Sequence, residues 1–362
     1  MRHPRLPVIP AAIVILLATS LCAAQQPRLS NGQLTVHAAA AGLESEFRSL
    51  VSAQTAPAWL GYAVPMIPGE HNMCCNGNSS GVNCCGSCRL EGKESGNVRS
   101  GDSPRIALEG GKSLLVLFRI EKGQVQKIRT FTEECQLDAG GLPFHWLTGV
   151  RPADSTTLLA TMIHIGEPED KATDRLAEAA LAALAFHDDP SADRVFEQST
   201  AANQPETVRE RASFWLGAAR GRKGYDILRR MMSDDPSVRV REKVVFALSI
   251  SKEPEAVTTM IEAAKGDKSD RVRGQALFWL GQKAGSKAIS AISDAIENDP
   301  ETDVKKKAVF ALSQLPPDDG VPRLIQVARA NKNPAVRKQA MFWLGQSKDP
   351  RALAFFEEVL TR

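Results

Sequence analysis

The sequence predicts an all-α, right-handed solenoid of about six helical hairpins, preceded by a small α+β module rich in cysteine. Three observations predict this fold class. A hydrophobic pattern recurs every 32 residues over residues 174–362. Every cysteine beyond the first 24 residues lies between Cys74 and Cys135. The chain is 43% hydrophobic and 24% charged, which is the composition of a folded globular protein.

The first 24 residues have the layout of a secretory signal peptide. Arg2 and Arg5 form a basic start, residues 10–21 are almost wholly apolar, and Ala24 provides a small residue before a cut at Gln25. We therefore expect export to the periplasm or the cell exterior. Membrane anchoring by an uncleaved N-terminal segment is the alternative. After cleavage no membrane span is expected, because no other segment is long and apolar enough.

Residues 25–165 are expected to form the α+β module. A helix is predicted over residues 30–53 and a strand over residues 59–67. Two β-rich apolar runs on either side of Glu121-Lys122-Gly123 predict a hairpin over residues 114–131. A polar stretch containing Gly and Pro then separates this module from the solenoid.

Six cysteines form the candidate site of the module. They are Cys74, Cys75, Cys84, Cys85, Cys88 and Cys135. Their even number after signal cleavage favours disulfides in an exported chain. Two alternatives stay open. One is a zinc site that combines Cys85 and Cys88 with further cysteines or His71, and the other is a redox couple formed by Cys85 and Cys88. Beyond this zinc, no cofactor is expected.

The repeat is defined by phenylalanines that lie 32 residues apart, each with a leucine two residues later. They are Phe214, Phe246, Phe278, Phe310 and Phe342. A valine six residues before each phenylalanine begins the apolar stripe of one helix, and a second helix follows in each unit. Leu184 marks one earlier unit. Because no single hairpin can bury its stripe, neighbouring units must stack.

Large and small side chains alternate directly after these phenylalanines. Trp215, Trp279 and Trp343 take turns with alanines. We interpret this alternation as close packing between units, with an aromatic ladder for a ligand as the alternative. Three Asp-Pro or Asn-Pro pairs also predict helix N-caps followed by proline. These pairs begin at Asp235, Asp299 and Asn333.

Each unit contains Val-Arg (or Val-Lys), then Ala and Leu-Gly or Leu-Ser, with Asp or Asn six residues before the basic residue. The Asp or Asn residues are Asn203, Asp235, Asp267, Asp299 and Asn331, and the basic residues are Arg209, Arg241, Arg273, Lys305 and Arg337. This motif resembles the short HEAT repeats of the phycobilisome-lyase type. The whole chain resembles exported bacterial HEAT-repeat proteins with a Cys-rich N-terminal domain. The resemblance implies a HEAT-type solenoid over residues 174–362.

The three residues after each valine form a candidate basic ridge, with ten basic residues against two acids. Its members are Arg209, Arg211, Arg241, Lys243, Arg273, Lys305, Lys306, Lys307, Arg337 and Lys338. One interpretation is a ladder of Asp–Arg pairs that ties the units together. The other is a binding surface for an acidic partner protein. Nucleic acid is not expected, because the ridge belongs to an exported chain and lacks interleaved exposed aromatics.

These patterns predict a non-catalytic exported scaffold that binds a partner protein through the solenoid, with a disulfide-stapled module as its N-terminal cap. The alternative is a redox- or metal-sensing protein, whose cysteines in residues 71–135 change state while the solenoid relays that change. An enzyme is less expected. Deoxyhypusine hydroxylase, a HEAT-repeat enzyme, binds two irons through His-Glu pairs, and this sequence contains no His-Glu dipeptide.

Overall fold

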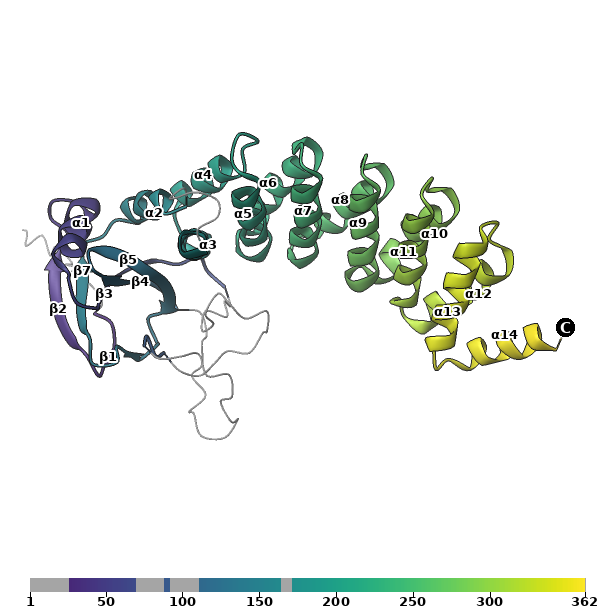
Figure 1. The fold of residues 1–362 in the computed structure, drawn as a ribbon, viewed down its shortest axis with the longest axis horizontal. Coiled ribbons are helices and arrows are strands. Elements are labelled where there is room, and N and C mark those ends of the chain that lie inside the picture. The colour runs from purple at the N-terminus through teal and green to yellow at the C-terminus, as the bar shows by residue number, and fades with distance from the viewer. Residues whose placement is uncertain (1–25, 70–87, 92–110, 164–170, 362) are drawn as a thin grey trace, which may run out of the picture.

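A computed structural model describes residues 26–69, 88–91, 111–163 and 171–361. Figure 1 shows a sheet at one end of the molecule and a row of stacked helices that extends away from it. The expected signal peptide and four of the cysteines (Cys74, Cys75, Cys84 and Cys85) lie outside the described residues. Within these four ranges, no helix has both the length and the apolar character of a membrane span.

A five-stranded mixed sheet organises the N-terminal part. The strand order is β2-β7-β3-β4-β5, in which β2, β7 and β3 are parallel and β3, β4 and β5 are antiparallel. The strands are β2 (Gln33–Ala38), β3 (Ala58–Pro65), β4 (Ser113–Glu121), β5 (Gln124–Thr132) and β7 (Pro143–Thr148). A separate short pair joins β1 (Leu29–Ser30) to β6 (Leu137–Asp138). The predicted hairpin is confirmed, and Lys122 and Gly123 form its turn with positive φ.

The helix predicted over residues 30–53 is wrong in its first part. Residues 33–38 form β2, and helix α1 spans only Leu43–Ala53. Strand β2 pairs with β7 in parallel, from Gln33 opposite Pro143 to Ala38 opposite Thr148. The pairing partner is remote in sequence, so the local pattern could not reveal it. Thr35 and Val36 are β-branched and suit this strand.

Both faces of the sheet are covered. Helix α1 packs on one face, where the rings of Phe47 and Phe118 meet edge-on with centroids 4.8 Å apart. The core on this side continues without a break into the core of the solenoid. The opposite face carries a smaller core that contains Trp59, Trp146 and the Cys88–Cys135 disulfide.

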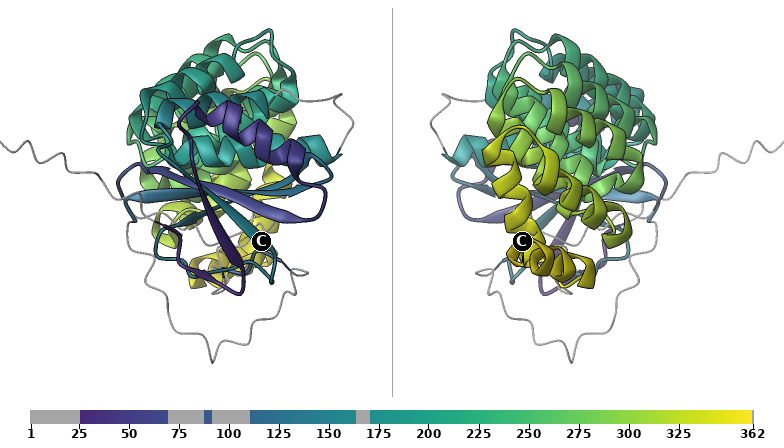
Figure 2. Two further views of the ribbon diagram at one scale, coloured as in Figure 1. Left: turned by 90° about the vertical axis from the view of Figure 1, so that its left-hand side faces the viewer. Right: turned by 90° about the vertical axis from the view of Figure 1, so that its right-hand side faces the viewer.

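The solenoid consists of helix pairs, and the six predicted units are confirmed within the described residues. Helix α2 (Pro152–Thr161) leads from the sheet to them. The first helices of the units are α3 (Lys171–Phe186), α5 (Glu206–Ala219), α7 (Val238–Ile250), α9 (Asp270–Lys283), α11 (Thr302–Ser313) and α13 (Pro334–Gln346). The second helices are α4 (Pro190–Ser199), α6 (Gly221–Asp234), α8 (Glu255–Gly266), α10 (Ile289–Asn298, after a 3₁₀ turn at Gly285–Ala288), α12 (Pro317–Ala330) and α14 (Pro350–Leu360). Figure 2 views the pairs along the stack.

Glycine and alanine allow neighbouring first helices to approach closely. A Cβ atom added to Gly217 would lie 2.2 Å from the backbone oxygen of Ala247, and one added to Gly281 would lie 2.8 Å from the Cα of Ala311. Ala247 and Ala311 are themselves fully buried. The alternation of tryptophan and alanine therefore has a packing reason, because the unit that follows each glycine needs a small side chain at this point.

A ladder of buried ion pairs joins successive units. The guanidinium groups of Arg209, Arg241 and Arg273 each bind both carboxylate oxygens of an aspartate in the following unit, over 2.7–3.2 Å. The aspartates are Asp235, Asp267 and Asp299. All six side chains are at most 11% exposed. We call these three pairs the Arg–Asp ladder.

The ladder also explains where the N-cap predictions were wrong. Asn333 does cap α13, since its side chain accepts a hydrogen bond from the Ala335 backbone N–H. Asp235 and Asp299 instead lie two residues before the caps of α7 and α11. Their carboxylates accept a backbone N–H from the loop as well as the ladder arginine. They serve the contact between units, not the helix end.

A buried polar chain joins the sheet to the solenoid. Ser155 Oγ in α2 lies 2.8 Å from both Tyr62 Oη in β3 and His187 Nε2 after α3. His187 Nδ1 lies 2.8 Å from the Ala183 carbonyl oxygen and must donate to it. Nε2 then accepts from Ser155, and Ser155 accepts from Tyr62. Burial lowers the pKa of His187 to about 4, which keeps the imidazole neutral.

We expect Arg273→Ala to lower the free energy of unfolding by about 3–5 kcal/mol, because it leaves a buried aspartate without its partner. Arg271 is the matched control. Its pair with Glu242 is exposed on the arginine side, so Arg271→Ala should cost about 1 kcal/mol or less. Urea unfolding of both variants measures the difference. Equal losses would show that the ladder does not hold the units together.

The His187 contacts predict a pH-dependent stability. Its pKa is about 4 in the folded chain and about 6.5 when unfolded. The unfolded state therefore binds the proton first, and stability falls as the pH drops from about 6.5 to about 4, by about 3 kcal/mol. Urea melts across this range should show that His187→Gln flattens this part of the profile. Parallel profiles for the two proteins would contradict the assignment.

Candidate functional site

The first helices carry a row of aromatic rings along one side of the solenoid. We call this row the aromatic face; its members are Phe214, Trp215, Phe246, Phe278, Trp279, Phe310, Phe342 and Trp343. Phe214 stacks on Phe246 with ring centroids 6.1 Å apart, and Phe278 stacks on Phe310 at 5.5 Å. Trp279 and Trp343 each contact the phenylalanine of the preceding unit at 5.0 Å. The rings thus run unbroken across five units.

These rings are partly exposed. Seven of them are half-buried, and Phe342 at the last of these units is 53% exposed. The three tryptophans pack against the main core and still keep part of the indole at the surface. The buried part of each indole agrees with the packing interpretation. The exposed part keeps open the alternative of an aromatic ladder for a ligand. A row of partly exposed aromatic rings of this kind is a candidate binding surface.

Among the described residues, two of the three indole N–H groups of the aromatic face have no acceptor. Trp215 Nε1 donates to Glu178 Oε1 over 2.9 Å. Trp279 Nε1 and Trp343 Nε1 have no hydrogen-bond partner in the described part of the chain. The position that Glu178 occupies is taken in the corresponding later units by Glu242, which pairs with Arg271, and by Lys306, which cannot accept. An unpaired buried donor costs about 1–3 kcal/mol.

Lysines lie one helical turn before three of the phenylalanines. Lys243 precedes Phe246, Lys307 precedes Phe310 and Lys338 precedes Phe342, each at a spacing of three or four residues. Such spacing places the two side chains next to each other on the helix surface. All three lysines are exposed, and none has an ion-pair partner among the residues that the structure describes. They add uncompensated positive charge to the aromatic face.

The structure divides the ten residues of the candidate basic ridge into three groups. Arg209, Arg241 and Arg273 belong to the buried ladder, and Lys305 and Arg337 occupy the same row, where they donate to backbone carbonyls. Arg211 pairs with Asp174, and Lys306 pairs with Asp303. Of the ten ridge residues, only Lys243, Lys307 and Lys338 are exposed cations with no ion-pair partner in the described part of the chain. Burial and pairing therefore remove most of the ridge from the surface.

Two of the six candidate cysteines are described. Cys88 and Cys135 form a disulfide that links the segment at residues 88–91 to the turn after β5, with both residues buried. This bond uses a sulfur that the proposed Cys85–Cys88 couple and the zinc site would both need. His71 and the other four cysteines lie outside the described residues. The bond favours the disulfide interpretation at these two positions.

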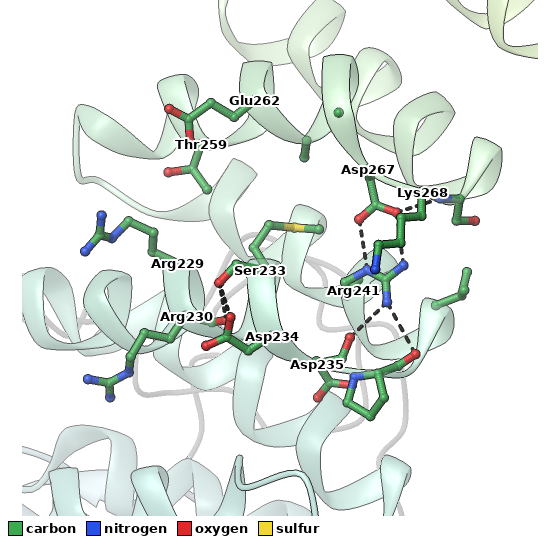
Figure 3. Close-up of a pocket in the computed structure, with 16 residues that line it drawn as sticks. Arg229, Arg230, Ser233, Asp234, Asp235, Arg241, Thr259, Glu262, Asp267 and Lys268 are labelled. Atoms are coloured by element: carbon green, nitrogen blue, oxygen red, sulfur yellow. Dashed lines mark hydrogen bonds and ion pairs between the residues drawn. The ribbon is translucent and has the colours of Figure 1, made fainter. Parts of the chain in front are cut away.

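The solenoid also has a hollow of about 960 Å³ between α6, α8 and the loops that follow them. In Figure 3, Arg241 lies at its edge, bound to Asp267 and to the backbone oxygens of Asp235 and Pro236. Arg229 and Arg230 extend away from that cluster. Positive and negative side chains are mixed around the hollow, and the ladder arginine is already fully bonded. The lining of the hollow therefore does not gather side chains of one charge or one chemical type.

Residues 192–281 and 289–362 match the sequence profile of HEAT repeats. The solenoid is built of HEAT repeats over residues 192–362. This agrees with the motif and the 32-residue period, and the matched residues include the whole aromatic face. No curated protein matches the chain.

Three solved structures illustrate the likeness of the HEAT solenoid to known proteins. YibA of Escherichia coli is 20% identical, with 57% of this chain and 79% of that chain covered and a TM-score of 0.38. The CpcE–CpcF complex of phycocyanin lyase from Nostoc is 25% identical, with 47% and 99% covered and a TM-score of 0.32. Human deoxyhypusine hydroxylase is 21% identical, with 56% and 82% covered and a TM-score of 0.25.

The tryptophans of the HEAT solenoid supply a matched pair of variants. Trp215→Phe removes an N–H that is bonded to Glu178, a carboxyl whose pKa is raised by burial. Trp279→Phe removes an N–H without a partner. We expect Trp215→Phe to cost about 1–2 kcal/mol more stability than Trp279→Phe. Denaturant melts measure this difference, and equal costs would show that Trp279 is bonded in solution.

Proposed function

We propose that this protein is an exported, non-catalytic scaffold that binds an acidic segment of a partner protein on the aromatic face of its HEAT solenoid. The observation that carries the proposal is the combination on one surface of eight aromatic rings with Lys243, Lys307 and Lys338. Aromatic residues are enriched where proteins bind one another. Solenoids in general use extended surfaces of stacked repeats for binding.

The charges around the aromatic face favour an acidic partner. The acids that lie in the corresponding rows are already paired, Glu210 with Arg239 and Glu242 with Arg271. The three lysines therefore have no internal counter-charge in the described ranges. A partner carboxylate would gain from each of them without displacing an existing pair.

The unpaired indoles support the same proposal. Trp279 Nε1 and Trp343 Nε1 are donors with no acceptor in the described residues. Both Nε1 atoms are buried, so a partner segment laid along the stacked phenylalanines would bond to them only if the indoles turned their N–H groups outward on binding. The cost of leaving the donors unpaired would then be recovered on binding.

The N-terminal part would serve as the cap of the solenoid. Its sheet and α2 pack against the first HEAT unit through the Tyr62–Ser155–His187 chain and the shared core. The Cys88–Cys135 bond is consistent with an oxidising compartment. Together with the signal-like residues 1–24, it supports our proposal that the protein works in the periplasm or outside the cell.

Reversing the three lysine charges tests the proposal. We expect the triple variant Lys243→Glu, Lys307→Glu, Lys338→Glu to reduce binding of the partner at least tenfold. We also expect the wild-type interaction to weaken as ionic strength rises, since exposed charges are screened by salt. The measurement is quantitative co-purification of the partner from the envelope fraction of the source cells, followed by titration of the purified partner.

The control variant carries the same charge change on the second helices. Lys223, Lys265 and Lys287 are exposed and lie away from the aromatic face, on α6, on α8 and just before α10. Their reversal to Glu should leave binding unchanged. If both triple variants bind the partner equally well, the aromatic face is not the binding surface.

A further inference from the structure

Two histidines face each other at the free edge of the N-terminal sheet, far from the aromatic face. His37 lies in β2 and His145 in the neighbouring β7, and both side chains are on the face that α1 covers. The register pairs Thr35 with His145 and His37 with Leu147, so the two imidazoles are diagonal neighbours on parallel strands. Glu46 approaches the same place from α1. Neither the Arg–Asp ladder nor the proposed binding surface uses these side chains.

The nitrogen atoms of the two rings are close. His37 Nε2 lies 3.1 Å from His145 Nδ1, and the ring centroids are 5.2 Å apart. On its other side, His37 Nδ1 lies 3.9 Å from Glu46 Oε1. The side chains of His37 and Glu46 are 24% and 30% exposed, so water and small ions can reach the pair. The two nitrogens share a single proton in this arrangement, because two N–H groups cannot point at each other.

The surroundings of His145 favour its neutral form. Burial lowers the pKa of His145, and a positive charge on His37 lowers it further. Neutral imidazole is the form that coordinates metal ions.

We propose that His37 Nε2 and His145 Nδ1 bind one divalent transition-metal ion, of the zinc, nickel or copper class, with water in the remaining positions. Nitrogen atoms 3.1 Å apart and about 2.0–2.1 Å from a metal subtend about 98° at that metal. This angle falls between the about 90° of square-planar sites and the about 109° of tetrahedral sites, and imidazole suits these three metals.

Glu46 acts in this site as a positioning residue. Coordination through Nε2 requires the proton of His37 to sit on Nδ1, where a carboxylate can accept it. Rotation of the partly exposed Glu46 side chain brings its oxygen from 3.9 Å to hydrogen-bond distance. Carboxylates behind metal-binding histidines fix the tautomer and orientation of the ring in this way. Binding then moves a proton within His37 or within His145 and releases none.

Water is needed to complete the coordination shell. In the residues that the structure describes, no three His, Cys, Asp or Glu side chains gather closely enough to hold a metal ion together. The ion would therefore keep open, exchangeable positions. Calcium and magnesium are not expected to compete, because they prefer shells of oxygen ligands.

Calorimetric titration of the full-length protein with ZnCl₂ and NiCl₂, after alkylation of free thiols, tests the proposal. We expect one ion per chain. His37→Ala and His145→Ala should each weaken binding at least a hundredfold, and Glu46→Gln about tenfold. His71→Ala is the matched control and should bind like the wild type. With Cu²⁺, electron paramagnetic resonance should show hyperfine coupling to two imidazole nitrogens, and to one in His37→Ala.

Circular dichroism melts separate loss of the site from loss of the fold. His37 is on the edge strand, so His37→Ala should melt close to the wild type even if His145→Ala does not. Unchanged metal affinity in His37→Ala would overturn the proposal, as would binding that is lost only in His71→Ala. Absence of any binding to the wild-type protein would overturn it as well, and would leave the proposed partner surface on the HEAT solenoid unaffected.

Discussion

The Arg–Asp ladder is the interaction on which the arrangement of the solenoid depends. Burying a charged pair is costly, and such a pair contributes little net stability compared with well-packed apolar groups. The Arg–Asp ladder instead fixes the register in which successive units stack. Each of Arg209, Arg241 and Arg273 is satisfied only when the aspartate of the next unit lies directly opposite. A shifted unit would leave a buried charge unpaired, so the ladder permits one way of stacking.

The register of the units in turn determines where the rings of the aromatic face lie. The rings of Phe214 and Phe246, and of Phe278 and Phe310, stack only because successive first helices are held at the same height and rotation. Close approach at Gly217 and Gly281 brings these helices together. The Arg–Asp ladder also pairs the arginines on one side of the first helices with aspartates. Among the described residues of the basic ridge, Lys243, Lys307 and Lys338 have no ion-pair partner and lie beside the rings, which is the basis of the proposed preference for an acidic partner.

The N-terminal sheet contributes a rigid end and a separate chemical feature. The Tyr62–Ser155–His187 chain joins the sheet to the first HEAT unit through groups that are wholly buried and fully bonded. His37 and His145 lie at the β2 edge of the same sheet and remain partly accessible. The two histidine sites differ because one is enclosed on all sides, whereas the other is at an edge strand with only one neighbour.

The 32-residue period by itself determined the solenoid and its six units, because the period repeats in the sequence. The two β-rich runs around Lys122-Gly123 determined the hairpin, because its pairing is local. The sequence also contained the ladder residues, but it could not tell buried arginines from exposed lysines on one basic ridge. That separation depends on which side of each helix meets the next unit. Strand β2, which was predicted as helix, and the pairing of His37 with His145 were likewise decided by the tertiary structure. Their partners are far apart along the chain, and only the assembled sheet brings them together.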